Sequence, residues 1–191
     1  MFGIDISHWD KDDKKHPINY ADVCRIFDFI IIKATDGANK DPEYMTAYNS
    51  TLRLKQGFYA YTYATTEAAA RREARAFCGA INGCKAEMGC YIDVEDKTLK
   101  KLSKKAVTAI VNAWILEAKK LGVDMGIYTN RNWIKNHLYL EGLVCERLWL
   151  AEYTDSIEKL IALRETYQPD IIQYGKYKMP NGRKADANII F

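Results

Sequence analysis

Two acids, Asp93 and Glu95, stand two positions apart at the end of a run that is typical of a buried strand, residues 90–95. Side chains at i and i+2 of a strand point to one face, so the two carboxyls are expected to be neighbours. Burial and mutual repulsion raise the pKa of one such acid, which can then donate a proton near neutral pH while its partner stays negative. This is the chemistry of glycoside hydrolysis, although the same spacing also suits a Mg²⁺ site or a surface salt-bridge cluster.

Two further acids stand near the ends of the chain. Asp5 follows the first predicted strand, and Asp186 begins the last one, which puts both at one rim if the last strand runs antiparallel. The C-terminal rim is where barrel enzymes place their active sites. Asp5 alone could be a buried acid that accepts hydrogen bonds from loop amides. Four acids that converge from separate strands are harder to explain in that way, because unpaired buried charge is expensive.

Strands and helices alternate along the chain, which favours a parallel α/β arrangement. Apolar runs predict strands at residues 2–7, 29–32, 57–63, 90–95, 125–129, 147–153, 170–174 and 186–191. Helical spacing predicts helices from about residue 19 and at residues 41–54, 66–81, 103–121, 130–138 and 156–163. Residues 11–16 are charged and turn-like, and a turn at residues 179–182 makes the last two strands an antiparallel pair. The pattern predicts an irregular TIM-like (β/α) barrel with eight strands and fewer than eight helices.

Composition narrows the class of protein. The 191 residues suffice for one domain with a full core, and we expect residues 1–191 to form a single catalytic domain. A net charge of +3 without a basic run among aromatics does not indicate nucleic-acid binding. Five loosely spaced cysteines make no disulfide framework, although they leave a Cys78–Cys84 pair open, and with three histidines they argue against zinc. No signal peptide precedes the first strand, and the longest apolar run, residues 29–32, is too short to cross a bilayer.

Eight short motifs, in order over essentially the whole chain, resemble glycoside hydrolase family 25, the Chalaropsis-type lysozymes of bacteria, fungi and many phages. They are residues 3–9 (GIDISHW), 31–37 (IIKATDG), 57–61 (GFYAY), 91–95 (YIDVE), 126–129 (GIYT), 148–153 (LWLAEY), 172–174 (IQY) and 186–188 (DAN). The chain departs from the family pattern at Asp36, where Glu is usual, at Ala60, where His is common, and at Ile172, where Trp is common. These departures concern the groove more than the acids.

The resemblance implies cleavage of the β-1,4 bond between N-acetylmuramic acid and N-acetylglucosamine in bacterial peptidoglycan. It implies that Glu95 is the general acid, that Asp93 is its acidic partner, and that Asp5 and Asp186 complete an acidic floor. It also implies a substrate groove, with Tyr59, Tyr61, Tyr128, Trp149 and Gln173 as its candidate residues. The family is retaining, and the nucleophile is either the substrate's own 2-acetamido group, which Asp93 would orient, or a carboxylate.

The expected partner is therefore peptidoglycan, with no cofactor, metal, nucleic acid or membrane, and the protein is expected to be a monomer. It would act on the cell wall, either as a phage endolysin released from the host cytoplasm or as a secreted enzyme whose leader has been removed. Three alternatives stay open: a chitinase-like endo-N-acetylglucosaminidase, a metal-dependent hydrolase with the four acids as oxygen ligands, and an inactive sugar-binding module. Retention of all four acids argues against the inactive module.

Overall fold

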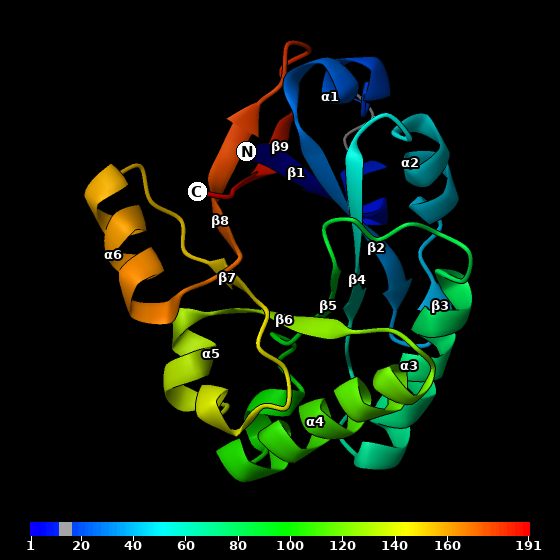
Figure 1. The fold of residues 1–191 in the computed structure, drawn as a ribbon, viewed down its shortest axis with the longest axis vertical. Helices are drawn as coiled ribbons and strands as arrows, with labels where there is room; N and C mark the ends of the chain where they lie inside the picture. The colour runs from blue at the N-terminus through cyan, green and yellow to red at the C-terminus, as the bar shows by residue number, and fades with distance from the viewer. Residues whose placement is uncertain (12–16) are drawn as a thin grey trace.

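The computed structural model describes residues 1–11 and 17–191, and its strands close into a barrel (Figure 1). The order around the ring is β1, β9, β8, β7, β6, β5, β4, β2, and pairing of β1 with β2 completes it. The strands are β1 (Phe2–Ile6), β2 (Phe29–Asp36), β4 (Lys55–Tyr61), β5 (Cys90–Asp93), β6 (Met125–Asn130), β7 (Leu148–Ala151), β8 (Ile171–Lys178) and β9 (Lys184–Ile189), with a two-residue strand, β3 (Asn39–Lys40), beside β2. This confirms the predicted irregular TIM-like barrel.

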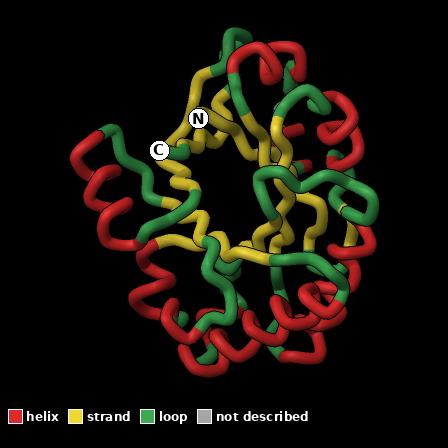
Figure 2. Tube along the Cα trace, viewed as in Figure 1, coloured by secondary structure: helices red, strands yellow, loops and turns green. Residues whose placement is uncertain are grey.

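Helices lie outside the ring of strands around most of its circumference (Figure 2). Within the described residues the six α-helices are α1 (Tyr20–Ile26), α2 (Tyr44–Ser50), α3 (Glu67–Ala80), α4 (Lys104–Lys120), α5 (Arg131–Asn136) and α6 (Ile157–Tyr167). The described parts of the chain also contain three short 3-10 helices, at His8–Lys11, Leu99–Lys101 and Leu140–Gly142. Helices α3 and α4 pack against each other, and each begins at a side-chain cap, Thr66 and Ser103 respectively.

Strand directions bring the two ends of the chain to one rim. Pairing is parallel from β1 through β2, β4, β5, β6 and β7 to β8, whereas β9 runs antiparallel to both of its neighbours, β8 and β1. The predicted antiparallel pair is thus confirmed. Because β9 is reversed, its first half lies at the rim where the other strands end, and Asp186 lies directly opposite Asp5.

Alternation along the strands divides the core into two layers. In β2, Phe29 and Ile31 point into the barrel, while Ile30 and Ile32 pack outward in the layer beneath the helices. The space for the Phe29 ring comes from Gly3 on β1, since a Cβ there would lie 2.3 Å from that ring. The inner layer consists of Phe29, Ile31, Tyr59, Tyr91, Tyr128, Trp149, Ala151 and Ile171.

Several predicted element bounds were wrong. The helix expected at residues 41–54 is the shorter α2, because Asp41 accepts a hydrogen bond from the Glu43 amide (2.8 Å) and forms a turn ahead of the helix. The strand expected at residues 90–95 ends at Asp93, and that expected at 57–63 is displaced to Lys55–Tyr61. The strand expected at 170–174 extends to Lys178, and its partner begins at Lys184 rather than at Asp186.

Three smaller expectations meet the structure as follows. The turn predicted at residues 11–16 lies outside the described residues, except that Lys11 ends the first 3-10 helix. All five cysteines are free thiols, so Cys78 and Cys84 form no disulfide. Along the described parts of the chain, no helix combines the length and apolar character that crossing a membrane requires.

Candidate active site

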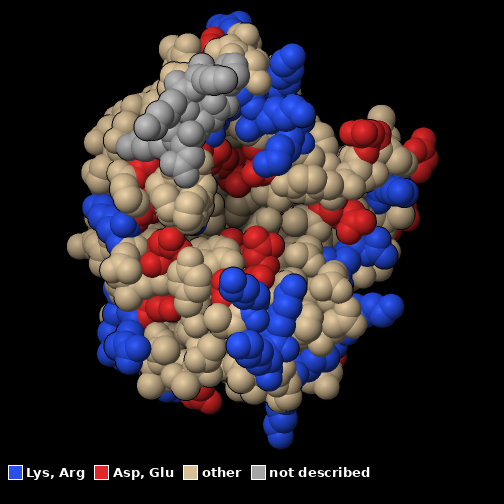
Figure 3. Space-filling model, turned by 180° about the vertical axis from the view of Figure 1, so that it is seen from behind, with Lys and Arg blue, Asp and Glu red and all other residues tan. Residues whose placement is uncertain are grey.

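The four predicted acids come together at the rim where β1 and β5 end and β9 begins. Asp5 and Asp186 are cross-strand partners. Asp93 ends β5, and Glu95 follows two residues later, with Val94 buried in the outer layer between them. Strand-like alternation therefore continues past the end of β5 and leaves both acids on the inner side. Figure 3, which views the molecule from behind, shows acidic side chains around a hollow near the middle of this face.

Asp5 lies at the bottom of the site in a network of buried amides. Its Oδ2 accepts hydrogen bonds from Gln173 Nε2 (2.9 Å) and Asn188 Nδ2 (2.8 Å). Tyr128 donates to Gln173 Oε1 (2.9 Å), and the Trp149 indole donates to Asn188 Oδ1 (2.8 Å). The amides of Gln173 and Asn188 thus each donate and accept within this network, which holds the carboxyl in one orientation.

Burial is the main reason that the Asp5 pKa is raised from 3.8 to about 8, with repulsion from Asp186 next. Hydrogen bonds from Asn188 and Gln173 oppose this rise, because they stabilise the charged form. With its pKa near 8, Asp5 retains its proton over most of the neutral range. Asp5 is therefore a neutral carboxylic acid, held by hydrogen bonds at the bottom of the site, rather than a free carboxylate.

Asp93 is the last residue of β5 and points to the inner side of the barrel. Its side chain is buried, and its Oδ1 has no hydrogen-bond partner among the described residues. Burial raises its pKa well above the ordinary value, repulsion from Glu95 adds to the rise, and the Lys33 ammonium opposes it. An unpartnered buried carboxyl oxygen is costly, so it marks a position where a ligand's N–H donor would be stabilising.

Glu95 is half-buried, above Asp93. Burial raises its pKa, a hydrogen bond from the Asn130 side chain lowers it, and the Asp186 charge raises it again. The Asn130 Oδ1 is occupied as the cap of α5, where it accepts from the Trp133 amide (3.2 Å), so its amide group faces the acid as a donor. A carboxyl that has a raised pKa and access to solvent suits a general acid.

Asp186 differs from the other three acids. It forms an ion pair with Lys176 (2.9 Å) and accepts a hydrogen bond from the Tyr153 hydroxyl. The Asp186 side chain is 27% exposed. Lys176 and Tyr153 therefore hold the Asp186 carboxyl at the edge of the pocket.

The predicted groove residues lie mostly below the acids. Trp149 is 1% exposed, and its ring contacts Tyr59 and Tyr128 with centroid distances of 5.7 and 4.4 Å. Gln173 is buried with both of its amide atoms occupied in the Asp5 network. Only Tyr61 is partly open, and it donates to Asp96 Oδ2 (3.1 Å). Contact of these residues with substrate stays a prediction.

Three polar residues of the site were absent from the predicted set. Lys33 is 3% exposed on the inner face of β2, with its ammonium 5.3 Å from the centre of the Tyr61 ring. Its charge lowers the pKa of both Asp93 and Glu95. A lysine that continues the inward alternation of Phe29 and Ile31 was the available signal. The sequence signals for the other two residues were weaker. Asn188 belongs to the last motif, and Asn130 stands at the start of a predicted helix.

A hollow of about 430 Å³ continues the rim on the side of β1, β2 and β4. It is lined by His8, Asp36, Gly37, Ala38, Asn39, Lys40, Pro42, Tyr63 and Glu73. His8 is held by Asp41, with Nδ1 and Oδ2 2.7 Å apart. None of the four acids lines this hollow.

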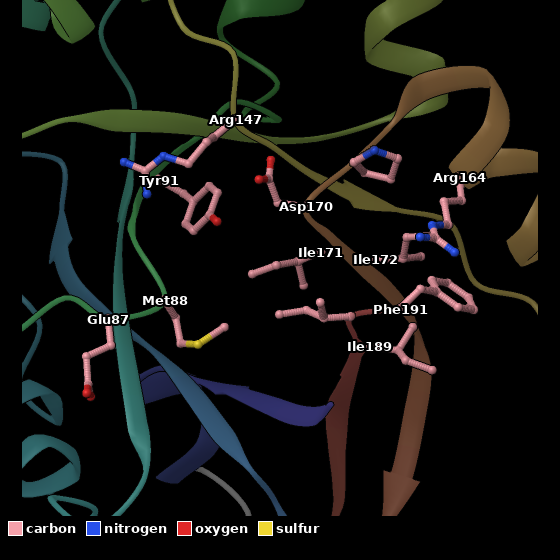
Figure 4. Close-up of a pocket in the computed structure, with 12 residues that line it drawn as sticks. Glu87, Met88, Tyr91, Arg147, Arg164, Asp170, Ile171, Ile172, Ile189 and Phe191 are labelled. Carbon is pink, nitrogen blue, oxygen red and sulfur yellow. The ribbon is translucent and has the colours of Figure 1, made fainter.

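The opposite end of the barrel carries another hollow, of about 410 Å³ (Figure 4). Two of its polar groups are occupied in structural contacts: Arg147 pairs with Asp124 (2.7 Å), and Asp170 accepts from the Leu148 amide (2.8 Å). None of the four acids lines it. Among the described residues no group of three His, Cys, Asp or Glu side chains is arranged to hold a metal ion, at either end.

Comparisons with known proteins identify the family. Its sequence model, described as glycosyl hydrolases family 25, matches residues 4–180, which include Asp5, Asp93 and Glu95 but not Asp186. No curated protein sequence matches the chain.

Solved structures share the fold over the whole chain. The glycosyl hydrolase 25 GHIP of Streptococcus pneumoniae superposes with a TM-score of 0.82 at 21% identity, over 100% of this chain and 86% of that one. The catalytic domain of endolysin ply40 from bacteriophage P40 of Listeria monocytogenes gives 0.79 at 20%, over 100% and 93%. The modular autolysin LytC from Streptococcus pneumoniae gives 0.78 at 21%, and this chain spans only 46% of it. With the family model covering the barrel from β1 past the end of β8, the chain belongs to glycosyl hydrolases family 25.

Proposed function

We propose that this glycosyl hydrolase is an N-acetylmuramidase, which cleaves the β-1,4 bond between N-acetylmuramic acid and N-acetylglucosamine in bacterial peptidoglycan. Membership of the family supports a glycosidase. Peptidoglycan as substrate is supported by relatives of the same fold, since LytC is described with a synthetic peptidoglycan ligand and the Cpl-1 endolysin with a peptidoglycan analogue. We also propose that residues 1–191 act as one catalytic domain, because the first and last strands pair inside one barrel.

In the proposed mechanism Glu95 protonates the glycosidic oxygen as the bond to C1 breaks. The Asp93 carboxyl accepts the N–H of the 2-acetamido group, and the acetamide oxygen attacks C1 from the opposite side. Water then opens the cyclic intermediate after Glu95, now a carboxylate, removes its proton. The second step returns Glu95 to its protonated state, and the product retains its configuration.

The observation that carries the proposal is the pair of acids with different surroundings. Glu95 is half-buried with a raised pKa and one amide donor, as a proton donor requires. Asp93 has a buried oxygen without a partner, as the acceptor of an acetamide N–H requires. Asp5, held by two amides, and Asp186, paired with Lys176, would fix the shape and charge of the floor.

The test is the release of reducing ends from purified peptidoglycan by wild-type protein and by Glu95→Gln. Loss of an essential general acid typically costs ~10²–10⁴-fold in rate. Glu87→Gln, an exposed position at the opposite end of the barrel, is the matched control and should keep the wild-type rate. If Glu95→Gln kept the wild-type rate with its thermal unfolding unchanged, Glu95 would not be the acid.

Products and chelation separate the remaining candidates. Mass analysis after borohydride reduction should place the new reducing end on muramic acid, whereas an endo-N-acetylglucosaminidase would place it on glucosamine. A metal-dependent hydrolase would lose activity in EDTA, and the proposed mechanism predicts an unchanged rate. An inactive binding module would retain wall fragments without releasing any reducing ends.

A further inference from the structure

The β8–β9 hairpin extends beyond the rim of the barrel. Strand β7 pairs with β8 only as far as Gln173, and β1 pairs with β9 from Asp186 onward. Beyond these points, residues 176–178 pair only with residues 184–186, of which Asp186 alone also pairs with β1. The end of the hairpin therefore forms a two-stranded arm with a face on each side.

The two faces of this arm have opposite character. Tyr177 lies on the outer face, where its ring packs against Phe2 and Phe27 with centroid distances of 5.5 Å each. Lys176, opposite Asp186, therefore lies on the other face, and so does the pair Lys178 and Lys184, two residues farther along each strand. Asp186 lies opposite Asp5 at the site, so this is the face toward the pocket.

Lys178 and Lys184 are directly opposite each other, and like charges in such a position are destabilising. Both side chains are exposed, and no acid among the described residues forms an ion pair with either. Lys176, by contrast, is neutralised by Asp186. In Figure 3 basic side chains gather on either side of the acidic hollow. A repulsive lysine pair beside the pocket, with no acidic partner among the described residues, favours an anionic ligand.

We propose that Lys178 and Lys184 form an anion-binding wall of the substrate cleft, which takes the carboxylates of the peptide stems carried by the glycan. This inference rests on the proposed function, because it concerns the same cleft and the same polymer. Stems branch from the muramic acid residues, so a glycan strand that lies over the acids would direct stems toward the walls of the cleft. Two adjacent ammonium groups match a carboxylate better than a neutral amide.

The test compares two forms of one substrate. Peptidoglycan is first freed of phosphate polymers with hydrofluoric acid, and half of it is treated with carbodiimide and ammonia, which converts stem carboxylates to amides. Initial rates of reducing-end release are measured on both forms at low salt. Each exposed charge contact contributes at most about a fivefold factor, so two contacts should make the wild-type rate on the carboxylate form several-fold higher, up to about 25-fold.

The variant Lys178→Gln/Lys184→Gln should lose this preference, so that the ratio of the two rates approaches one. The wild-type preference should also shrink in high salt, because exposed charges are screened. The control Lys85→Gln/Lys119→Gln removes two exposed lysines before β5 and at the end of α4, away from the rim, and should keep the wild-type ratio.

An unchanged ratio in the hairpin variant would overturn the inference while leaving the proposed function intact. A dependence on these lysines that occurs only with wall that still carries phosphate polymers would assign the site to phosphate and would overturn the stem assignment. If wild-type protein released no reducing ends from either form, the proposed function would fail first, and the inference with it.

Discussion

Replacement of Asp5 by Asn should stabilise the protein at neutral pH, even though Asp5 is one of the predicted catalytic acids. The Asp5 pKa is 3.8 in an unperturbed chain and about 8 in the fold. When the pKa of an acid is higher in the folded protein than in the unfolded chain, the acid contributes its full stabilisation of the fold at pH values below its pKa in the unfolded chain. That contribution is lost as pH rises toward the folded value, because the unfolded chain releases its proton first.

The size of the effect follows from these two values. Between pH 3.8 and 8 the loss is about 1.4 kcal/mol for each pH unit, so ionisation of Asp5 in the unfolded chain costs roughly 4 kcal/mol at pH 7. An Asn side chain does not ionise, so Asp5→Asn does not lose stability as pH rises in this way. Its Oδ1 can accept from Gln173 and Asn188 as the Asp5 Oδ2 does, so the network would survive the change. The advantage of Asp5→Asn should therefore grow by about 3 kcal/mol from pH 5 to pH 7.

Urea unfolding at pH 5, 6 and 7 measures this difference directly. The free energy of unfolding of Asp5→Asn should exceed that of the wild type by an amount that rises with pH, while lytic activity falls. Asp155→Asn, at an exposed acid, should change stability by no more than about 0.5 kcal/mol at each pH. If the gap between Asp5→Asn and wild type were the same at pH 5 and pH 7, a protonated Asp5 in the folded state would be refuted.

Three further changes test other contacts. Lys33→Met removes a cation that lowers the Glu95 pKa, so the alkaline limb of the pH–rate profile should move to higher pH. Lys33→Arg keeps the charge and should leave this limb near its wild-type position. An unmoved limb in Lys33→Met would contradict the reasoning. Trp149→Phe removes the donor to Asn188 Oδ1 and leaves a buried acceptor without its partner. The free energy of unfolding, measured in urea, should fall by about 1–3 kcal/mol. A fall of less than about 0.5 kcal/mol would contradict this contribution of the hydrogen bond. Gly79 lies inside α3, and a Cβ at this position would meet open space. Gly79→Ala should therefore raise the melting temperature and increase the free energy of unfolding by up to about 1 kcal/mol. A lower melting temperature would indicate a clash that the structure does not contain.

Elements with strong local signals were predicted almost to the residue. Helix α4 was expected at residues 103–121 and is found at Lys104–Lys120, because Ser103 caps its first turn and Gly122 follows its end at φ +79°. The end of β8 was missed because its last residues alternate lysine and tyrosine on an arm outside the barrel. Pairing with β9, rather than an apolar pattern, makes those residues a strand.

The sequence by itself determined which acids are present, their D-x-E spacing, the order of the motifs and the barrel class, because periodicity and strand-end positions are local properties. Only the tertiary structure decided the state of each acid. Desolvation and charge interactions depend on distances in space, and the amide that holds Asp5 belongs to Asn188, 183 residues away along the chain. The same is true of Lys33, whose charge acts on Asp93 only because β2 and β5 share one barrel interior. The acid pair at residues 93 and 95 was visible in the sequence, but what distinguishes its two members lies in the surroundings that the fold assembles around them.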